Sequence, residues 1–212
     1  MQNPAKSQHF RCYRVRPHAK NRRGKVIPRR SVGQPNAGAF VRAVTQQQLE
    51  EPSSSRLADI RPTDSDDVPI CVSLAEGTQV FSPSEIHGLE EDLVACLRGD
   101  YREDRLLSAD VGGRVSGFVH YGPSDIGEGT WYLYWIAVDR ASHGLGLGLS
   151  LLRRVEDAAR EQQGRLLLIE TSSLPRYEAT RRFYLRNGYR QDCVIHDFYS
   201  DGDHKVVFSK KL

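Results

Sequence analysis

The chain has 212 residues, of which 27% are charged and 39% hydrophobic, and its formal net charge is +3. This length accommodates one folded domain and an extension. No apolar run reaches the length of a membrane span or of a signal-peptide core, so we expect a cytoplasmic protein that has no membrane partner. The four cysteines lack the spacing of metal ligands, so we expect free thiols and no metal centre; they are Cys12, Cys71, Cys96 and Cys193.

Charge is distributed unevenly along the chain. Residues 1–49 contain 11 basic and no acidic residues, whereas residues 50–212 contain 19 basic and 27 acidic residues, a net charge of −8. The basic segment has no apolar periodicity, so it cannot bury enough surface to offset the entropy of ordering. We predict a disordered basic arm and linker over residues 1–55 and a folded domain over residues 56–212. A nucleic-acid-binding arm, a transit peptide and a solvated tail are the alternatives for the arm.

Hydrophobic periodicity and turn signals divide the folded part into elements in the order β-α-α-β-β-β-α-β-α-β-β. The first six cover residues 57–62 (strand), 68–76 and 82–97 (helices), 105–111, 114–121 and 129–139 (strands). The last five cover residues 149–163 (helix), 166–170 (strand), 177–186 (helix), 189–198 and 205–210 (strands of a final hairpin).

The helix over residues 149–163 has the clearest two-sided pattern. Its apolar face is predicted to hold Leu149, Leu152, Val155 and Ala159. Its polar face is predicted to hold Arg153, Arg154, Glu156, Asp157 and Arg160. Gly164 stands where a glycine commonly ends a helix.

The strand over residues 129–139 leads into a turn with a glycine at every second position, His143-Gly144-Leu145-Gly146-Leu147-Gly148. Glycines allow positive φ and leave backbone N–H groups uncovered, and the helix start that follows adds further donors. Such a turn can bind a pyrophosphate-like anion; the alternative is a tight turn that binds nothing. The glycine spacing departs from the dinucleotide-binding fingerprint, and the turn lacks the lysine of a P-loop.

Two segments resemble motifs of the GNAT superfamily of acyl-CoA-dependent N-acetyltransferases. Residues 143–148 are similar to its Arg/Gln-x-x-Gly-x-Gly/Ala coenzyme A loop, except that His143 replaces the first residue. Residues 180–189 resemble its Ala-x-x-Phe-Tyr-x-x-x-Gly-Phe/Tyr block. The resemblance covers about residues 57–212. It implies an α+β fold with a mixed, mostly antiparallel sheet of about seven strands and helices on both faces.

The resemblance implies acetyl-CoA as cosubstrate and no metal. In the family, the strand before the glycine loop pairs with the pantetheine arm, which gives that role to the backbone of Val138. Where many relatives have an asparagine that contacts coenzyme A, this chain has Tyr177. Backbone N–H groups would hold the pyrophosphate at five consecutive residues after His143: Gly144, Leu145, Gly146, Leu147 and Gly148.

The resemblance also implies a general acid and leaves the general base open. Tyr184 matches the family tyrosine that protonates the departing thiolate, and a phenol is protonated at neutral pH. The alternative for Tyr184 is an aromatic side chain that only packs. Candidates for the base are Glu170 at a strand end, His120 and His196, and water is a further alternative.

The final hairpin carries aspartates and aromatic residues close together. Asp197 is suited to hold an ammonium group by charge-assisted hydrogen bonds, and Tyr199 by cation–π attraction. The alternative is an ordinary turn, because Asp and Gly favour turns.

We therefore expect an N-acetyltransferase that acts on a primary amine of a small molecule or peptide. The alternatives are a non-catalytic module that senses acyl-CoA and a nucleic-acid-associated protein that uses residues 1–49. A homodimer is one alternative for its assembly.

Overall fold

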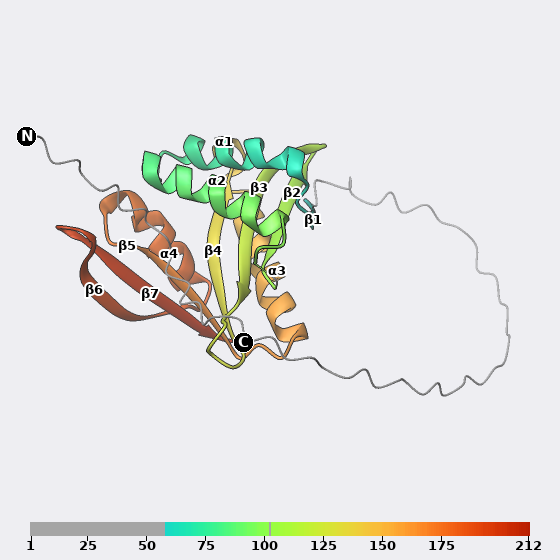
Figure 1. Cartoon of the computed structure of the whole chain (residues 1–212). Coiled ribbons are helices and arrows are strands. Elements are labelled where there is room, and N and C mark those ends of the chain that lie inside the picture. The colour runs from blue at the N-terminus through green and yellow to red at the C-terminus, as the bar shows by residue number, and fades with distance from the viewer. Residues whose placement is uncertain (1–57, 102) are drawn as a thin grey trace, which may run out of the picture. The chain divides into compact units, whose positions relative to one another are not determined.

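The protein is described by a computed structural model that covers residues 58–212, except residue 102. The arm predicted for residues 1–55 lies outside these residues. Seven strands form one sheet in the order β1-β2-β3-β4-β5-β7-β6 (Figure 1). The strands are Asp59–Pro62 (β1), Arg105–Val111 (β2), Arg114–Pro123 (β3), Thr130–Val138 (β4), Leu166–Ser172 (β5), Arg190–Ser200 (β6) and Asp203–Lys211 (β7). The helices are Val68–Thr78 (α1), Pro83–Leu97 (α2), Leu147–Glu161 (α3) and Glu178–Arg186 (α4).

The sheet is mostly antiparallel. Only β4 and β5 run parallel, and the chain crosses between them through α3. This is the predicted order of elements, and the mixed sheet confirms the predicted α+β fold.

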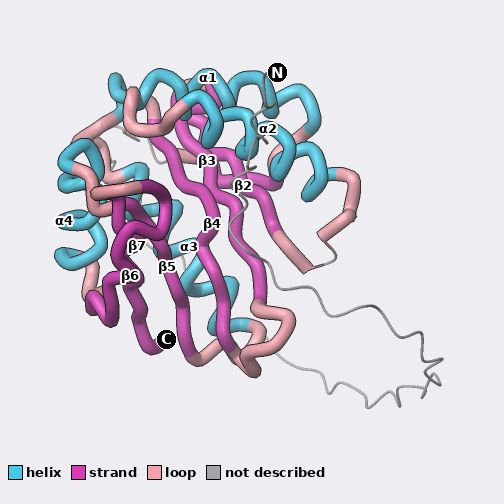
Figure 2. The backbone as a smooth tube through the Cα atoms, turned by 60° about the vertical axis from the view of Figure 1, so that its left-hand side comes forward, coloured by secondary structure: helices cyan, strands magenta, loops and turns pink. Residues whose placement is uncertain are grey.

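Helices cover both faces of the sheet, as Figure 2 shows for α1 and α2 on one face and α3 on the other. Successive side chains of a strand point to opposite faces of the sheet, so each strand contributes to two hydrophobic clusters, one on each face. On β3, Phe118 packs with the cluster of α1 and α2, whereas the next residue, Val119, packs with the cluster of α3 and α4. Within the described residues, no helix is both long and apolar enough to cross a membrane.

One prediction for α3 is wrong. Glu156 was assigned to the polar face but is only 4% exposed. Its carboxylate accepts hydrogen bonds from the Tyr189 hydroxyl at 3.0 Å and from Lys210 Nζ at 2.8 Å. A buried carboxylate is tolerated only with such partners, and both come from segments that are distant in the sequence.

The boundaries of the final hairpin also differ from the prediction. β6 continues to Ser200 and β7 begins at Asp203, so only Asp201 and Gly202 form the turn. Gly202 has a φ of +78°, which suits a tight hairpin turn. The segment predicted as a loop is therefore mostly strand.

Candidate active site

The parallel strands β4 and β5 separate halfway along their length. Their pairing ends at Leu133 and Ile169, although both strands continue beyond these residues. The register of β4 with β3 shifts at the same place, because His120 pairs with Trp135 and Tyr121 with Leu133. Tyr134 is thus the extra residue of a β-bulge, and a bulge bends its strand. The bulge accounts for the opening, whose mouth lies toward the ends of β4 and β5.

The glycine turn lies just after β4. Gly144 and Gly146 have φ values of +81° and +78°, a region that side chains disfavour. A Cβ at either position would have no heavy atom of the described residues within 4 Å, so both glycines border open space. Gly146 is the N-cap of α3 and provides no side-chain cap. The first N–H groups of α3 are therefore available to an anion, as the macrodipole favours.

Gly148 and Val138 connect the turn to its surroundings. A Cβ at Gly148 would lie 3.7 Å from the Val138 side chain and 3.8 Å from Phe183, so the ends of β4, α3 and α4 meet here. The imidazole of His143 is exposed, and its Nε2 lies 3.1 Å from the Val138 carbonyl oxygen. His143 thus donates to the strand end in this structure. Leu145, at the tip of the turn, is 58% exposed.

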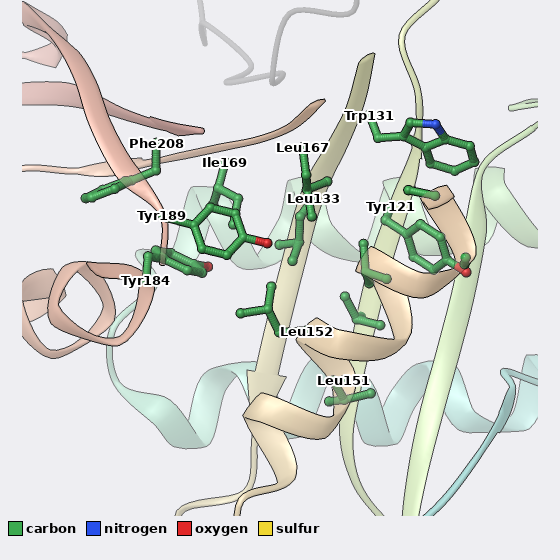
Figure 3. Packing of buried hydrophobic residues seen from close by; sticks show 14 of the residues in the cluster. Tyr121, Trp131, Leu133, Leu151, Leu152, Leu167, Ile169, Tyr184, Tyr189 and Phe208 are labelled. Carbon is green, nitrogen blue, oxygen red and sulfur yellow. The ribbon is translucent and has the colours of Figure 1, made fainter. Parts of the chain in front are cut away.

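Tyr184 is buried, with 3% of its surface exposed. Its ring packs against Phe183, Tyr189 and Phe208 at centroid distances of 5.5–5.8 Å. In Figure 3 the Tyr184 hydroxyl points the same way as that of Tyr189, toward the side of the cluster formed by α3. Burial raises the pKa of Tyr184 above its ordinary value, so its hydroxyl keeps its proton at neutral pH.

Tyr177 lies in the 3₁₀ turn Pro175–Tyr177 before α4, and its side chain is engaged with α2. Its hydroxyl donates to Glu85 Oε1 at 2.8 Å, and its ring packs edge-on against Phe81 at 6.3 Å. Glu85 also caps α2, because its Oε2 accepts from the backbone N–H of Ser82. The residue expected to contact coenzyme A therefore joins α4 to the turn between α1 and α2.

Glu170 lies at the mouth of the opening, as the first β5 residue beyond the pairs with β4. Its Oε2 forms an ion pair of 2.7 Å with Lys205 Nζ of β7. The same ammonium lies 3.5 Å from the ring centroid of Phe198 and 5.9 Å from that of Tyr199. Lys205 is only 6% exposed. A carboxylate and two aromatic rings at the hairpin are thus suited to bind an ammonium group, but the ammonium of Lys205 already occupies the position between them.

Asp197 closes the hairpin. Its φ is +49°, and its Oδ1 accepts a hydrogen bond of 2.8 Å from the backbone N–H of Gly202. Its own N–H donates to Nδ1 of His204 at 2.9 Å. Nearby, the Ser172 hydroxyl donates to Oδ1 of the buried Asp203. The contacts of Asp197 lie within the hairpin, and the hydrogen bond of Ser172 joins the hairpin to the end of β5.

The two histidine candidates for the base have different environments. His196 is exposed on β6 and packs edge-on against His204 at 4.6 Å. His120 is 2% exposed on β3, and its Nε2 lies 3.2 Å from Asp104 Oδ2. No motif or spacing in the sequence indicated Asp104, which lies in the segment between α2 and β2. No group of three or more His, Cys, Asp or Glu side chains that could hold a metal ion occurs in the described part of the chain.

The fold and this site together define an α+β protein with a glycine-rich turn at a helix start, beside an opening between two parallel strands. A family model described as the acetyltransferase (GNAT) family matches residues 74–189, more than half of the chain. This chain therefore belongs to the GNAT acetyltransferase family.

Individual relatives agree with this assignment. An uncharacterised N-acetyltransferase of Methanocaldococcus jannaschii is 31% identical over 145 residues, covering 62% of this chain and 88% of the relative. The crystal structure of a putative GNAT acetyltransferase from Desulfovibrio desulfuricans matches with a TM-score of 0.69 and 33% identity, covering 73% of this chain and 99% of that one. A putative acetyltransferase of Salmonella typhimurium, solved with acetyl-CoA, matches with a TM-score of 0.60 and 17% identity, covering 74% and 94%. The last likeness concerns the fold alone.

Proposed function

We propose that this protein is an N-acetyltransferase that moves the acetyl group of acetyl-CoA to a primary amine of a small molecule or peptide, by direct transfer in a ternary complex. The observation that carries the proposal is the glycine turn at residues 144–148, in which Gly144 and Gly146 border open space and which follows β4 beside its opening from β5. Family membership supports acetyl transfer as the reaction.

In this proposal the turn binds the pyrophosphate of acetyl-CoA, and the pantetheine arm enters the opening beside Val138. The bulge at Tyr134 then has a role in the reaction, because it bends β4 away from β5 and makes room for the thioester. The mouth of the opening, where Tyr134 and Glu170 follow the last paired residues of the two strands, is the proposed place for the acceptor amine.

The amine attacks the carbonyl carbon, the carbon–sulfur bond breaks, and the thiolate takes a proton from Tyr184. The raised pKa of Tyr184 keeps that proton available at neutral pH. Asp197 and Tyr199 remain proposed acceptor contacts and Glu170 a proposed base, although each has a partner within the chain.

The test is thiol release from acetyl-CoA over a panel of amines and peptides, with the wild type and Tyr184→Phe. We expect turnover with at least one amine and a decrease of about 100-fold or more in the variant, the usual effect of a positioned acid, with unchanged acetyl-CoA binding. Tyr189→Phe is the matched control, since it removes a neighbouring hydroxyl that bonds Glu156 instead. Binding of acetyl-CoA without turnover of any amine would favour a non-catalytic sensor.

A further inference from the structure

The ammonium of Lys205 lies beside the opening between β4 and β5. Lys205 belongs to β7, which pairs with β5 on the side away from β4 (Figure 1). Its Nζ forms an ion pair of 2.7 Å with Oε2 of Glu170. Glu170 is the first residue of β5 beyond the pairs with β4, so it lies at the level where the opening begins. A single carboxylate therefore links the Lys205 nitrogen to the proposed place for the acceptor amine.

The surroundings of Lys205 are those that an acceptor amine would need. The side chain is buried, and its Nζ lies 3.5 Å from the ring centroid of Phe198 and 5.9 Å from that of Tyr199. Aromatic faces and a carboxylate both attract an ammonium group. An ammonium has three N–H donors, and within the described residues Glu170 gives Nζ its one oxygen partner. The nitrogen is thus held at the site without being fully hydrogen-bonded.

Lys210, also on β7, shows how a structural ion pair of this chain is built. Its Nζ donates to Oε1 and Oε2 of Glu156 at 2.8 and 3.0 Å and to the carbonyl oxygen of Asn187 at 3.0 Å. Each of its three donors therefore has an oxygen partner. Lys210 also lies where β5 still pairs with β4, whereas Lys205 lies beyond the point where the two strands part. The two lysines differ both in their hydrogen bonding and in their distance from the opening.

We propose that Lys205 is a site of self-acetylation, at which acetyl-CoA bound to the glycine turn transfers its acetyl group to Nζ. This inference rests on the proposed acetyl transfer. The ammonium passes one proton to the Glu170 carboxylate across their 2.7 Å contact, and the nitrogen lone pair attacks the thioester carbonyl carbon. The carbon–nitrogen bond forms, the carbon–sulfur bond breaks, and the thiolate takes a proton from Tyr184. The nitrogen loses a second proton, which restores Tyr184, and keeps the third as the amide N–H. Glu170 releases its proton to solvent.

The exposure of the lysines gives the proposal a sharp test. Lys211 is exposed at the end of β7, whereas Lys205 is only 6% exposed. Acetyl-CoA in bulk solution reaches exposed amines first, so chemical acetylation favours Lys211. Delivery through the opening reverses this order, because holding two reactants together raises their effective concentration. The amide that forms has no charge, so the modification removes the ion pair with Glu170 and the cation–π contacts of the hairpin.

The test is mass spectrometry of the full chain after incubation with isotope-labelled acetyl-CoA and no added amine. We expect label on Lys205 at least about 10-fold faster than on Lys211, at a rate per chain that does not depend on protein concentration. Gly146→Asp, which should weaken acetyl-CoA binding, should remove the label from Lys205 and leave that on Lys211. Lys205→Arg and, as its matched control, Lys211→Arg each remove one lysine, and only the first should abolish the fast label.

The main measurement is made on the wild type, so it does not depend on the folding of a variant. Unlabelled acetyl already on Lys205 of the purified wild type, and absent from purified Gly146→Asp, would support the proposal equally. Equal labelling of Lys205 and Lys211, or an unmodified Lys205 in a wild type that acetylates an added amine, would overturn it and leave acetyl transfer intact. A wild type that binds acetyl-CoA but acetylates neither Lys205 nor any amine of the panel would instead contradict the proposed function.

Discussion

The glycine turn at residues 143–148 and the β6–β7 hairpin were both predicted to bind part of the substrates, and the structure treats them differently. The turn uses backbone donors, and Gly144 and Gly146 border open space. The hairpin uses side chains, and these have partners: Asp197 holds the N–H of Gly202, while Phe198 and Tyr199 face Lys205. The backbone N–H groups at a helix start keep their binding capacity after folding, because the first turn has no partners for them within the helix. Charged and aromatic side chains that could bind an ammonium group also bind each other, and they then have less capacity left for a ligand.

The largest difference between the glycine turn and the hairpin is expected when the same substitution, glycine to aspartate, is made in each. Gly146 and Gly202 each have a φ of +78° and open space at the Cβ position, so aspartate strains both backbones by about 1–2 kcal/mol. Gly146→Asp should also weaken acetyl-CoA binding at least about 100-fold, because it repels the pyrophosphate and displaces charge-assisted hydrogen bonds of about 1.5–3 kcal/mol each. Gly202→Asp should bind acetyl-CoA like the wild type. Calorimetry on both variants measures this, and equal affinities would remove the pyrophosphate site from the turn.

Lys205→Met tests whether the hairpin is filled by the chain itself. The substitution keeps an apolar stem over Phe198 but leaves the carboxylate of Glu170 without its ion-pair partner. We expect a loss of about 2 kcal/mol in the free energy of unfolding, with acetyl-CoA affinity unchanged. Urea unfolding provides the measurement, and the double variant with Glu170→Gln should recover part of the loss. Unchanged stability together with a lower KM for a cationic acceptor would show that Lys205 only competes with the substrate for this site.

His143→Ala asks how much of the turn's affinity comes from a side chain. The imidazole donates to the Val138 carbonyl in this structure, and the proposed phosphate contacts are backbone N–H groups. We therefore expect the Kd for acetyl-CoA to change by less than about 5-fold, which corresponds to about 1 kcal/mol. A much larger loss would show that the imidazole turns toward the phosphate when acetyl-CoA binds.

The smallest effect is expected from Asp197→Asn. Asparagine tolerates a positive φ, and its amide oxygen can still accept from Gly202. The free energy of unfolding should stay within about 0.5 kcal/mol of the wild type. As a proposed acceptor contact, Asp197 should affect binding more than chemistry, so KM for the acceptor should rise about 3-fold while kcat changes less. Thermal melts and steady-state kinetics check both. An unchanged KM would leave Asp197 with a structural role in the hairpin only.

The order of the elements and the glycine turn could be predicted because they depend on local signals. Amphipathic spacing defined α3 and the strands, and alternating glycines before a helix indicated the proposed anion site. The partners of single side chains could not be predicted. Glu156 fits a polar face by its spacing, but Tyr189 and Lys210 meet it from segments about 30 and 50 residues away. Tyr177 matches a family coenzyme A contact by position, and no local signal indicated that its hydroxyl also donates to Glu85 of α2.

The sequence by itself determined the fold class, the family resemblance and the segment whose backbone can hold an anion, because periodicity and glycine positions act over a few residues. Only the tertiary structure decided where β4 leaves β5, that Lys205 occupies the hairpin's ammonium site, and that Asp104 meets His120. A bulge is set by the register of neighbouring strands, and a buried charge by which distant segment supplies its partner. These depend on long-range packing, which no local pattern of residues records.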